Sequence, residues 1–144
     1  MTADAAEEIL NEELKGYKAL LSLLQRERVC LLGFDTESYE AISKEKDTLV
    51  FRLRLLDEER QRVMSRLFGG EMNLKRIAEA TGNARLLEIR STFLSLLQGV
   101  EELNNLNRML IDRSLNYLRG TARFLSSAGI PGPREKGALY SGEV

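Results

Sequence analysis

Apolar residues recur every three or four positions along most of the chain, the pattern of a helix that packs one face against a neighbour. From about Ala5 to Leu32 this spacing is kept by Leu10, Leu14, Tyr17, Leu21, Leu24 and Leu31. From about Glu37 to Phe68 it is kept by Tyr39, Ile42, Leu49, Leu53, Leu56, Val63 and Leu67. Gly33 is a stop signal and Asp35 a helix cap, so the pattern predicts two long helices joined by a short turn.

A third long helix is predicted from Leu86 to Ser127, and it carries two apolar rows. The first row is Leu86, Ile89, Phe93, Leu96, Val100, Leu103, Leu110, Tyr117 and Phe124. The second begins after Leu106 and consists of Ile111, Leu115, Leu118, Ala122 and Leu125. At about 100° per residue the two rows lie roughly 120° apart. One row can pack on the chain's own core, and the other is a candidate surface for a partner's helix.

The remaining segments complete an all-α prediction. A short helix or turn is expected from Glu71 to Ala80, with Asn83 as the cap of the long helix. Residues 128–144 contain both prolines with Gly and Ser, a composition that cannot offset the entropy of ordering. We therefore expect an elongated antiparallel helical bundle or hairpin of three long helices plus one short helix. Residues 1–127 would form this domain, and residues 128–144 a flexible C-terminal tail.

Several polar residues fall within the apolar seams. Arg28, Lys46 and Arg60 are interpreted as snorkelling cations, whose stems pack while their heads reach water or a nearby Glu. Asn107 lies on the seam of the last helix, where a buried Asn fixes register. Asn104 is next to Asn105, and both could simply face water.

Composition narrows the classes of partner. The 144 residues carry a net charge of -1, with basic and acidic residues interleaved, and aromatics make up 6% without any Trp. This is the pattern of solvated helix faces and argues against nucleic acid as a partner. No segment reaches the ~20 apolar residues that a membrane-spanning helix needs, so we expect no membrane insertion and a cytoplasmic location.

The sequence offers little for catalysis or cofactors. There is no His, which removes the usual general base and most zinc sites. Adjacent acidic pairs such as Glu12/Glu13 do not face each other on a helix and are interpreted as solvated faces. Cys30, the only cysteine, lies in an apolar run and is interpreted as a half-buried structural residue. We expect no catalytic residues, no metal, no cofactor and no enzymatic activity.

Four features together resemble the FlgN family, the flagellar type III export chaperones for hook–filament junction proteins. They are the leucines around Glu27-Arg28, Glu45-Lys46 followed by Leu49, Leu53 and Arg60, Asn104 and Asn107 before Leu110-Ile111, and Leu139-Tyr140 before Gly142. Together they span nearly the whole chain.

The resemblance implies a helical chaperone of the bacterial cytosol. Such chaperones bind the C-terminal helical region of unassembled hook-associated junction proteins, prevent premature assembly and deliver them to the export gate. Tyr140 in the tail would engage the cytosolic domain of the gate protein. The client-binding residues, from the resemblance and the second apolar row together, would be Asn104, Asn107, Leu110, Ile111, Leu115, Leu118 and Leu125.

Two alternatives stay open. In one, the chain is a structural or adaptor coiled-coil protein whose second apolar row makes a homodimer. In the other, it is a type III chaperone for a different flagellar client, such as the filament cap, because a helix-binding surface carries little information about partner identity.

Overall fold

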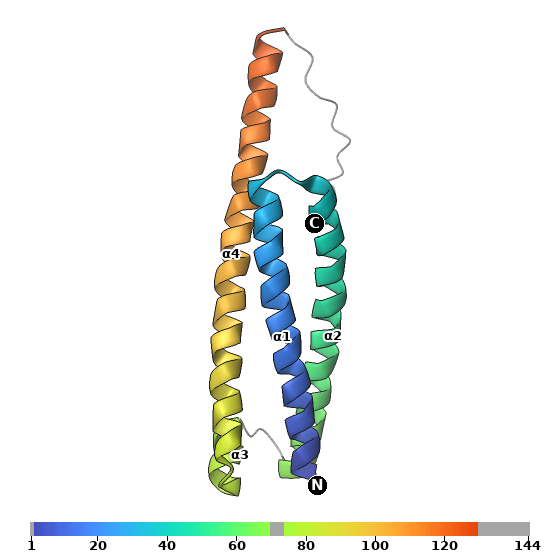
Figure 1. Ribbon diagram of the computed structural model, residues 1–144, viewed down its shortest axis with the longest axis vertical. Helices are drawn as coiled ribbons and strands as arrows, with labels where there is room; N and C mark the ends of the chain where they lie inside the picture. The colour runs from blue at the N-terminus through green and yellow to red at the C-terminus, as the bar shows by residue number, and fades with distance from the viewer. Residues whose placement is uncertain (1, 70–73, 130–144) are drawn as a thin grey trace.

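The computed structural model describes residues 2–69 and 74–129, which form three long helices and a short one (Figure 1). The helices are α1 (Thr2–Leu32), α2 (Thr36–Phe68), α3 (Leu74–Thr81) and α4 (Ala84–Ser127). The described residues contain no strand, so the all-α prediction is confirmed. Each helix begins and ends within three residues of the predicted position.

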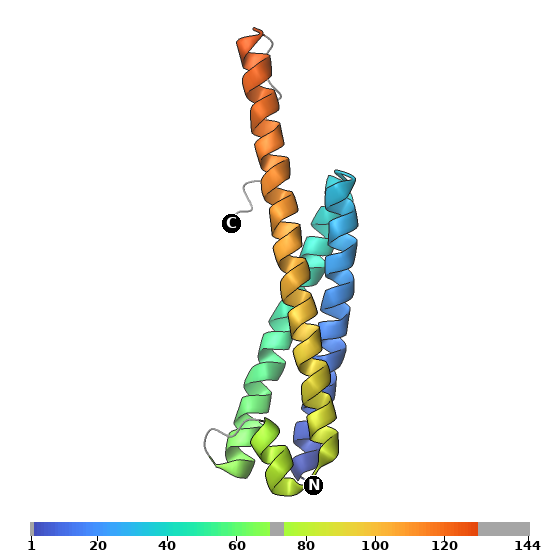
Figure 2. The same ribbon diagram turned by 90° about the vertical axis from the view of Figure 1, so that its left-hand side faces the viewer.

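The long helices alternate in direction. α1 and α2 form an antiparallel hairpin, and α4 then runs back alongside α1, so that α1 and α4 are parallel (Figure 1). α3 lies at the end where α2 finishes and α4 begins, opposite the α1–α2 turn (Figure 2). α4 has 44 residues against 31 in α1 and 33 in α2, and its C-terminal part extends beyond the α1–α2 turn.

Side chains close the helix ends at the two predicted caps. The Asp35 carboxylate accepts a hydrogen bond of 3.1 Å from the Ser38 N–H at the start of α2. The Asn83 side chain accepts one of 3.0 Å from the Arg85 N–H at the start of α4. The turn after α1 takes its left-handed residue one position later than the expected glycine, at Phe34 with φ of 54°. This conformation costs a non-glycine residue about 1 kcal/mol, and the Phe34 ring is exposed.

The hydrophobic core changes its composition along the bundle. At the α3 end all four helices contribute, through Ala6, Leu10, Leu14, Met64, Ile77, Ala78, Leu86 and Ile89. In the middle, Leu20 and Leu24 of α1 and Leu53 of α2 pack with Val100 and Leu103 of α4. Nearest the α1–α2 turn the cluster is Leu23, Cys30 and Ile42, with Tyr39 and Leu49, all from α1 and α2. α4 therefore leaves the described core near Leu103. Cys30 was expected to be half-buried and is buried, 8% exposed.

Candidate functional site

The candidate site is the C-terminal part of α4, which we call distal α4 (residues 108–127). The buried residues of α4 are Leu86, Ile89 and Asn107, so every residue of distal α4 is at least partly exposed. Beyond the α1–α2 turn, α4 continues without another helix of the described chain beside it (Figures 1 and 2). Its apolar residues thus lose the neighbours that cover the same helix lower down.

The second apolar row lies on the side of α4 that faces α1. Asn107 marks this side because its side chain contacts α1. Ile111, Leu118 and Leu125 follow Asn107 by 4, 11 and 18 residues, which places them within about 40° of it around the helix. Ile111, Leu115 and Leu125 are half-buried, and Leu118 is 41% exposed. The row therefore continues the α1-facing seam past the point where α1 ends.

The first apolar row leaves the core at this end of α4. Tyr117 is 68% exposed and Phe124 is 69% exposed, so the first row does not pack on the core at these two positions. The cause is the length of the hairpin, because α4 extends beyond the α1–α2 turn without another helix of the described chain beside it (Figure 1). Leu110, closer to the hairpin, is half-buried.

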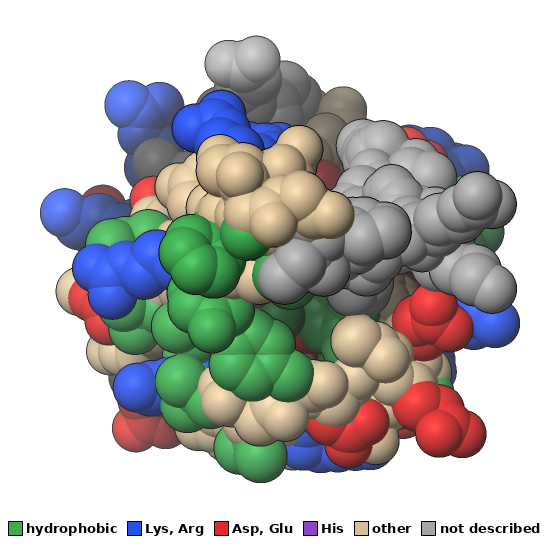
Figure 3. Space-filling view, turned by 90° about the horizontal axis from the view of Figure 1, so that it is seen from above, with side chains coloured by type: hydrophobic (Ala, Val, Ile, Leu, Met, Phe, Trp, Pro, Cys, Tyr) green, Lys and Arg blue, Asp and Glu red, His purple; other side chains and the backbone are tan. Residues whose placement is uncertain are grey.

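The α1–α2 turn adds apolar surface at the base of distal α4. Val29, Leu32 and Phe34 are exposed there. Viewed from this end, hydrophobic side chains gather on one side of the molecule, with Lys and Arg side chains along part of the edge (Figure 3). Exposed apolar area of this kind is typical of a surface that binds another protein.

A buried polar cluster holds α4 where the core stops. Glu27 on α1 is 1% exposed and accepts a 2.7 Å hydrogen bond from Lys46 Nζ on α2. Asn107 on α4, also 1% exposed, donates through Nδ2 to Glu27 Oε1 and to the Leu24 carbonyl, both at 2.9 Å. We call this set the Glu27 cluster. It joins the three long helices at one level.

The orientation of Asn107 follows from its neighbours. Its two N–H groups face two acceptors, and a flipped amide would put its oxygen against the Glu27 carboxylate. Its Oδ1 is buried and has no hydrogen-bond partner among the described residues. Asn107 is thus buried on the seam as expected, and its amide is already engaged within the chain. Asn104 is half-buried.

A second ion pair, around Glu13, crosses the bundle nearer the α3 end. Glu13 is 0% exposed and accepts a 2.8 Å hydrogen bond from Arg60 Nε, while Arg60 also pairs with Asp57. The Arg60 guanidinium lies over the Phe93 ring, 5.9 Å from its centroid. The interpretation of Lys46 and Arg60 as snorkelling cations that reach a Glu is confirmed, whereas Arg28 is exposed.

The burial of Glu13 corrects a prediction. The Glu12/Glu13 pair was expected to face water, but Glu13 lies in the seam of α1, three residues after Leu10. Burial raises the pKa of the Glu13 carboxyl, and the charge and hydrogen bond of Arg60 oppose this. The sequence signal was the position of Arg60 in the seam of α2, because a buried cation calls for a carboxylate opposite.

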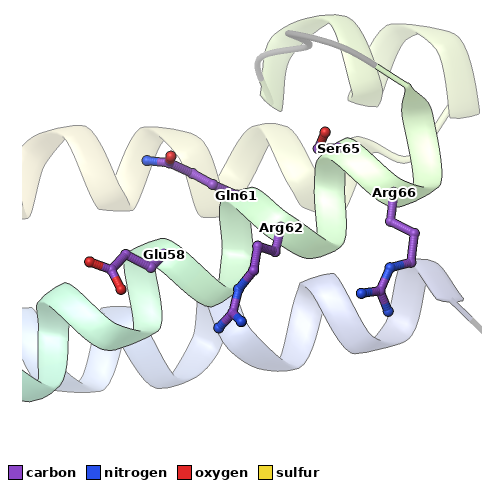
Figure 4. A pocket seen from close by; sticks show the side chains of 5 residues that line it. All are labelled: Glu58, Gln61, Arg62, Ser65 and Arg66. Carbon is purple, nitrogen blue, oxygen red and sulfur yellow. The ribbon is translucent and has the colours of Figure 1, made fainter.

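Outside distal α4, the described chain has a shallow surface pocket but no cluster of metal-ligating side chains. A shallow pocket is lined by Glu58, Gln61, Arg62, Ser65 and Arg66, all exposed and all on α2 (Figure 4). No group of three or more metal-ligating side chains occurs within residues 2–69 and 74–129. None of the helices in that part of the chain is long and apolar enough to cross a membrane. Tyr140 and the predicted tail lie outside the described residues, apart from Ala128 and Gly129.

Among the comparisons with known proteins, the family comparison gives a match. Neither the curated proteins nor the solved structures include a significant match to the chain. A family model described as FlgN protein matches residues 1–140, which is nearly the full length. FlgN proteins are chaperones rather than enzymes. The match covers Glu27, Lys46 and Asn107, the three residues that meet in the Glu27 cluster. The chain therefore belongs to the FlgN family of flagellar export chaperones.

Proposed function

We propose that the chain binds the C-terminal helical region of hook-associated junction proteins on distal α4. The observation that carries this proposal is the apolar row that continues the α1-facing seam beyond the end of α1. Nearer the α3 end, the same side of α4 is covered by α1 and α2, as at Val100 and Leu103. A client helix would occupy the position that α1 vacates and would complete the bundle at that level.

The contacts would come mainly from leucine and isoleucine. Leu118 is the most exposed member of the row, and Ile111, Leu115 and Leu125 present part of their side chains. Full burial of one such side chain contributes about 1.5–3 kcal/mol. The cost of association offsets much of the gain from three or four such side chains, so we expect an affinity nearer micromolar than picomolar. Leu110 and Asn104 would lie at the base of the site.

Asn107 has an indirect role in this proposal. Its side chain is buried and bonded to α1, so we assign it to holding α4 against the hairpin rather than to contacting the client. A rigid base would keep distal α4 oriented and would reduce the conformational entropy that a client must remove on binding.

We further propose that the chaperone acts in the bacterial cytoplasm and delivers its client to the export gate through Tyr140. The support for the gate contact is the resemblance of Leu139-Tyr140 and Gly142 to the tail motif of the family. The family model extends as far as residue 140. This division would separate client binding on α4 from gate binding on the tail.

A pull-down from lysate of a flagellated cell would test both parts, with the intact chain and a form truncated after Ser127 as baits. Immunoblots would be made for the hook–filament junction proteins and for the export-gate protein. Both baits should retain a junction protein, and only the intact chain should retain the gate protein. If neither is retained and the protein elutes as a tight dimer, the proposal fails and the adaptor coiled-coil alternative is favoured. Retention of the filament cap protein instead would assign a different client.

A further inference from the structure

Distal α4 is strongly basic within a chain that is nearly neutral. Between residues 108 and 127 it carries Arg108, Arg113, Arg119 and Arg123 against one acidic residue, Asp112, a net charge of +3. The whole chain has a net charge of -1. The excess of positive charge is therefore a local property of the surface that the previous section assigns to client binding.

Three of the four arginines border the apolar face, and they lie on both of its sides. Arg108 and Arg119 lie seven residues before and four residues after Leu115, within about 40° of it around the helix. On the other edge, Arg113 lies four residues before Tyr117 and eleven before Phe124, again within about 40°. A helix seated on the apolar face would therefore have guanidinium groups along each flank.

All four arginines are exposed, and none has an ion-pair partner within residues 2–69 and 74–129. Along the hairpin, by contrast, carboxylates on neighbouring helices face several arginines. Arg26 pairs with Glu45, Arg52 with Glu12, and Arg85 with Glu7. The hairpin thus supplies acidic partners where helices lie side by side, and distal α4 lacks the helix that would supply them.

We propose that the segment bound by distal α4 is an amphipathic helix whose apolar stripe is flanked by Asp and Glu. This inference rests on the proposed function, which it deepens by naming the charge of the client helix. The apolar row gives affinity, and the flanking carboxylates select the partner and its direction, because opposite charges across an interface favour one pairing and one register. Residues 111–127 span about 24 Å, which a partner helix of roughly 17 residues would cover.

A basic amphipathic helix can also bind an anionic membrane, but the geometry here favours a helix. The apolar row lies on the α1-facing side, in the corner between α4 and the end of the α1–α2 hairpin (Figures 1 and 2). Because the end of the hairpin stands beside the base of distal α4, a flat bilayer cannot lie along this side of α4 as far as the hairpin, whereas a helix of about 10 Å diameter can (Figure 1).

The test uses the full-length protein and two synthetic helical peptides of about 18 residues with the same leucine stripe. One peptide carries Glu on both flanks and the other carries Lys. Titration calorimetry should show the acidic peptide binding at least about tenfold more tightly at low salt, with the difference shrinking as salt screens the charges. Equal affinity for the two peptides, or no binding of the acidic one, would overturn the inference.

Matched variants separate this inference from the proposed function. Arg108→Gln combined with Arg119→Gln should weaken binding of the acidic peptide by about fivefold to tenfold. The control, Arg62→Gln combined with Arg66→Gln on α2, should leave this affinity unchanged. If the first pair has no effect but Leu118→Glu still abolishes binding of the acidic peptide, only the charge inference fails. If Leu118→Glu binds as tightly as the native chain, distal α4 is not the site and both fail. Preferential binding of anionic phosphatidylglycerol vesicles that depends on Arg108 and Arg119 would mean that distal α4 binds a membrane and not an acidic helix.

Discussion

Asn107 and Glu27 are 80 residues apart in the sequence and are joined by a buried hydrogen bond of 2.9 Å. With Lys46 they tie α4, α1 and α2 together at the level where α4 leaves the hydrophobic core. On the α3 side of this level the three helices share one core, and on the other side α1 and α2 continue only as far as their turn, beyond which α4 has no helix of the described chain beside it. The bond therefore marks the boundary between the folded scaffold and the surface that we assign to the client.

Replacing Asn107 by Asp should strongly destabilise the fold. The substitution removes the two N–H donors and places a second carboxylate beside Glu27 in a buried site. An uncompensated buried charge costs about 3 kcal/mol or more of unfolding free energy. Urea denaturation followed by circular dichroism measures this change.

The matched control for Asn107→Asp is Asn105→Asp, because Asn105 is exposed on the same helix two residues away. An exposed substitution should alter the unfolding free energy by no more than about 0.5 kcal/mol. Equal effects of the two variants would mean that the Glu27 cluster does not hold α4.

The unfolding free energy should depend on pH through Glu13. Burial raises the pKa of this carboxyl above its ordinary value of 4.5, so folding favours the protonated form. The stability that Glu13 contributes is complete below pH 4.5 and is lost as the pH rises through its raised folded pKa. The variant Glu13→Gln is neutral at every pH, and it should gain in stability relative to the native chain as the pH rises.

Urea midpoints of the native chain and Glu13→Gln, measured at matched pH values from about 4 to about 7, give this difference directly. If the native chain instead becomes more stable relative to Glu13→Gln as the pH rises over this range, the prediction is wrong. That result would mean that the pairing of Glu13 with Arg60 outweighs the cost of burial.

Much of this fold could be predicted from the sequence, because leucines at three-four spacing report a buried helix face whatever it packs against. The same spacing placed Asn107 on the seam of α4. Glu13 was missed because its acidic neighbour, Glu12, suggested a solvated pair, and only the position of Arg60 pointed otherwise. The burial of a carboxylate depends on a partner 47 residues away.

The sequence also did not determine which end of α4 lacks a neighbouring helix. The predicted helix lengths already made α4 longer than α1, but the overhang depends on how α4 is aligned along α1. That alignment is set by tertiary contacts such as Leu86 and Ile89 in the core at the α3 end. The same alignment leaves Tyr117 and Phe124 exposed. The spacing of apolar residues alone cannot show whether a given position is buried or exposed.

Tyr140→Ala should separate the two proposed binding activities. We expect the variant to bind a junction protein as tightly as the native chain and to bind the cytosolic domain of the export-gate protein more weakly. Tyr117→Ala is the matched control, because it removes another tyrosine, 68% exposed on α4, and should leave gate binding unchanged. Surface plasmon resonance with each purified partner measures both affinities. Unchanged affinity of Tyr140→Ala for the gate protein would show that Tyr140 does not make the gate contact.

The most direct test of the central claim is the affinity of Leu118→Glu for the purified C-terminal helical region of a hook–filament junction protein. Leu87→Glu is the control, since Leu87 is also on α4 and is 43% exposed against 41% for Leu118, but lies at the α3 end. Titration calorimetry should show at least about tenfold weaker binding for Leu118→Glu, native affinity for Leu87→Glu, and unchanged helical circular dichroism for both. Native affinity in Leu118→Glu, or a loss of its helicity, would contradict the assignment of distal α4 as the client-binding surface.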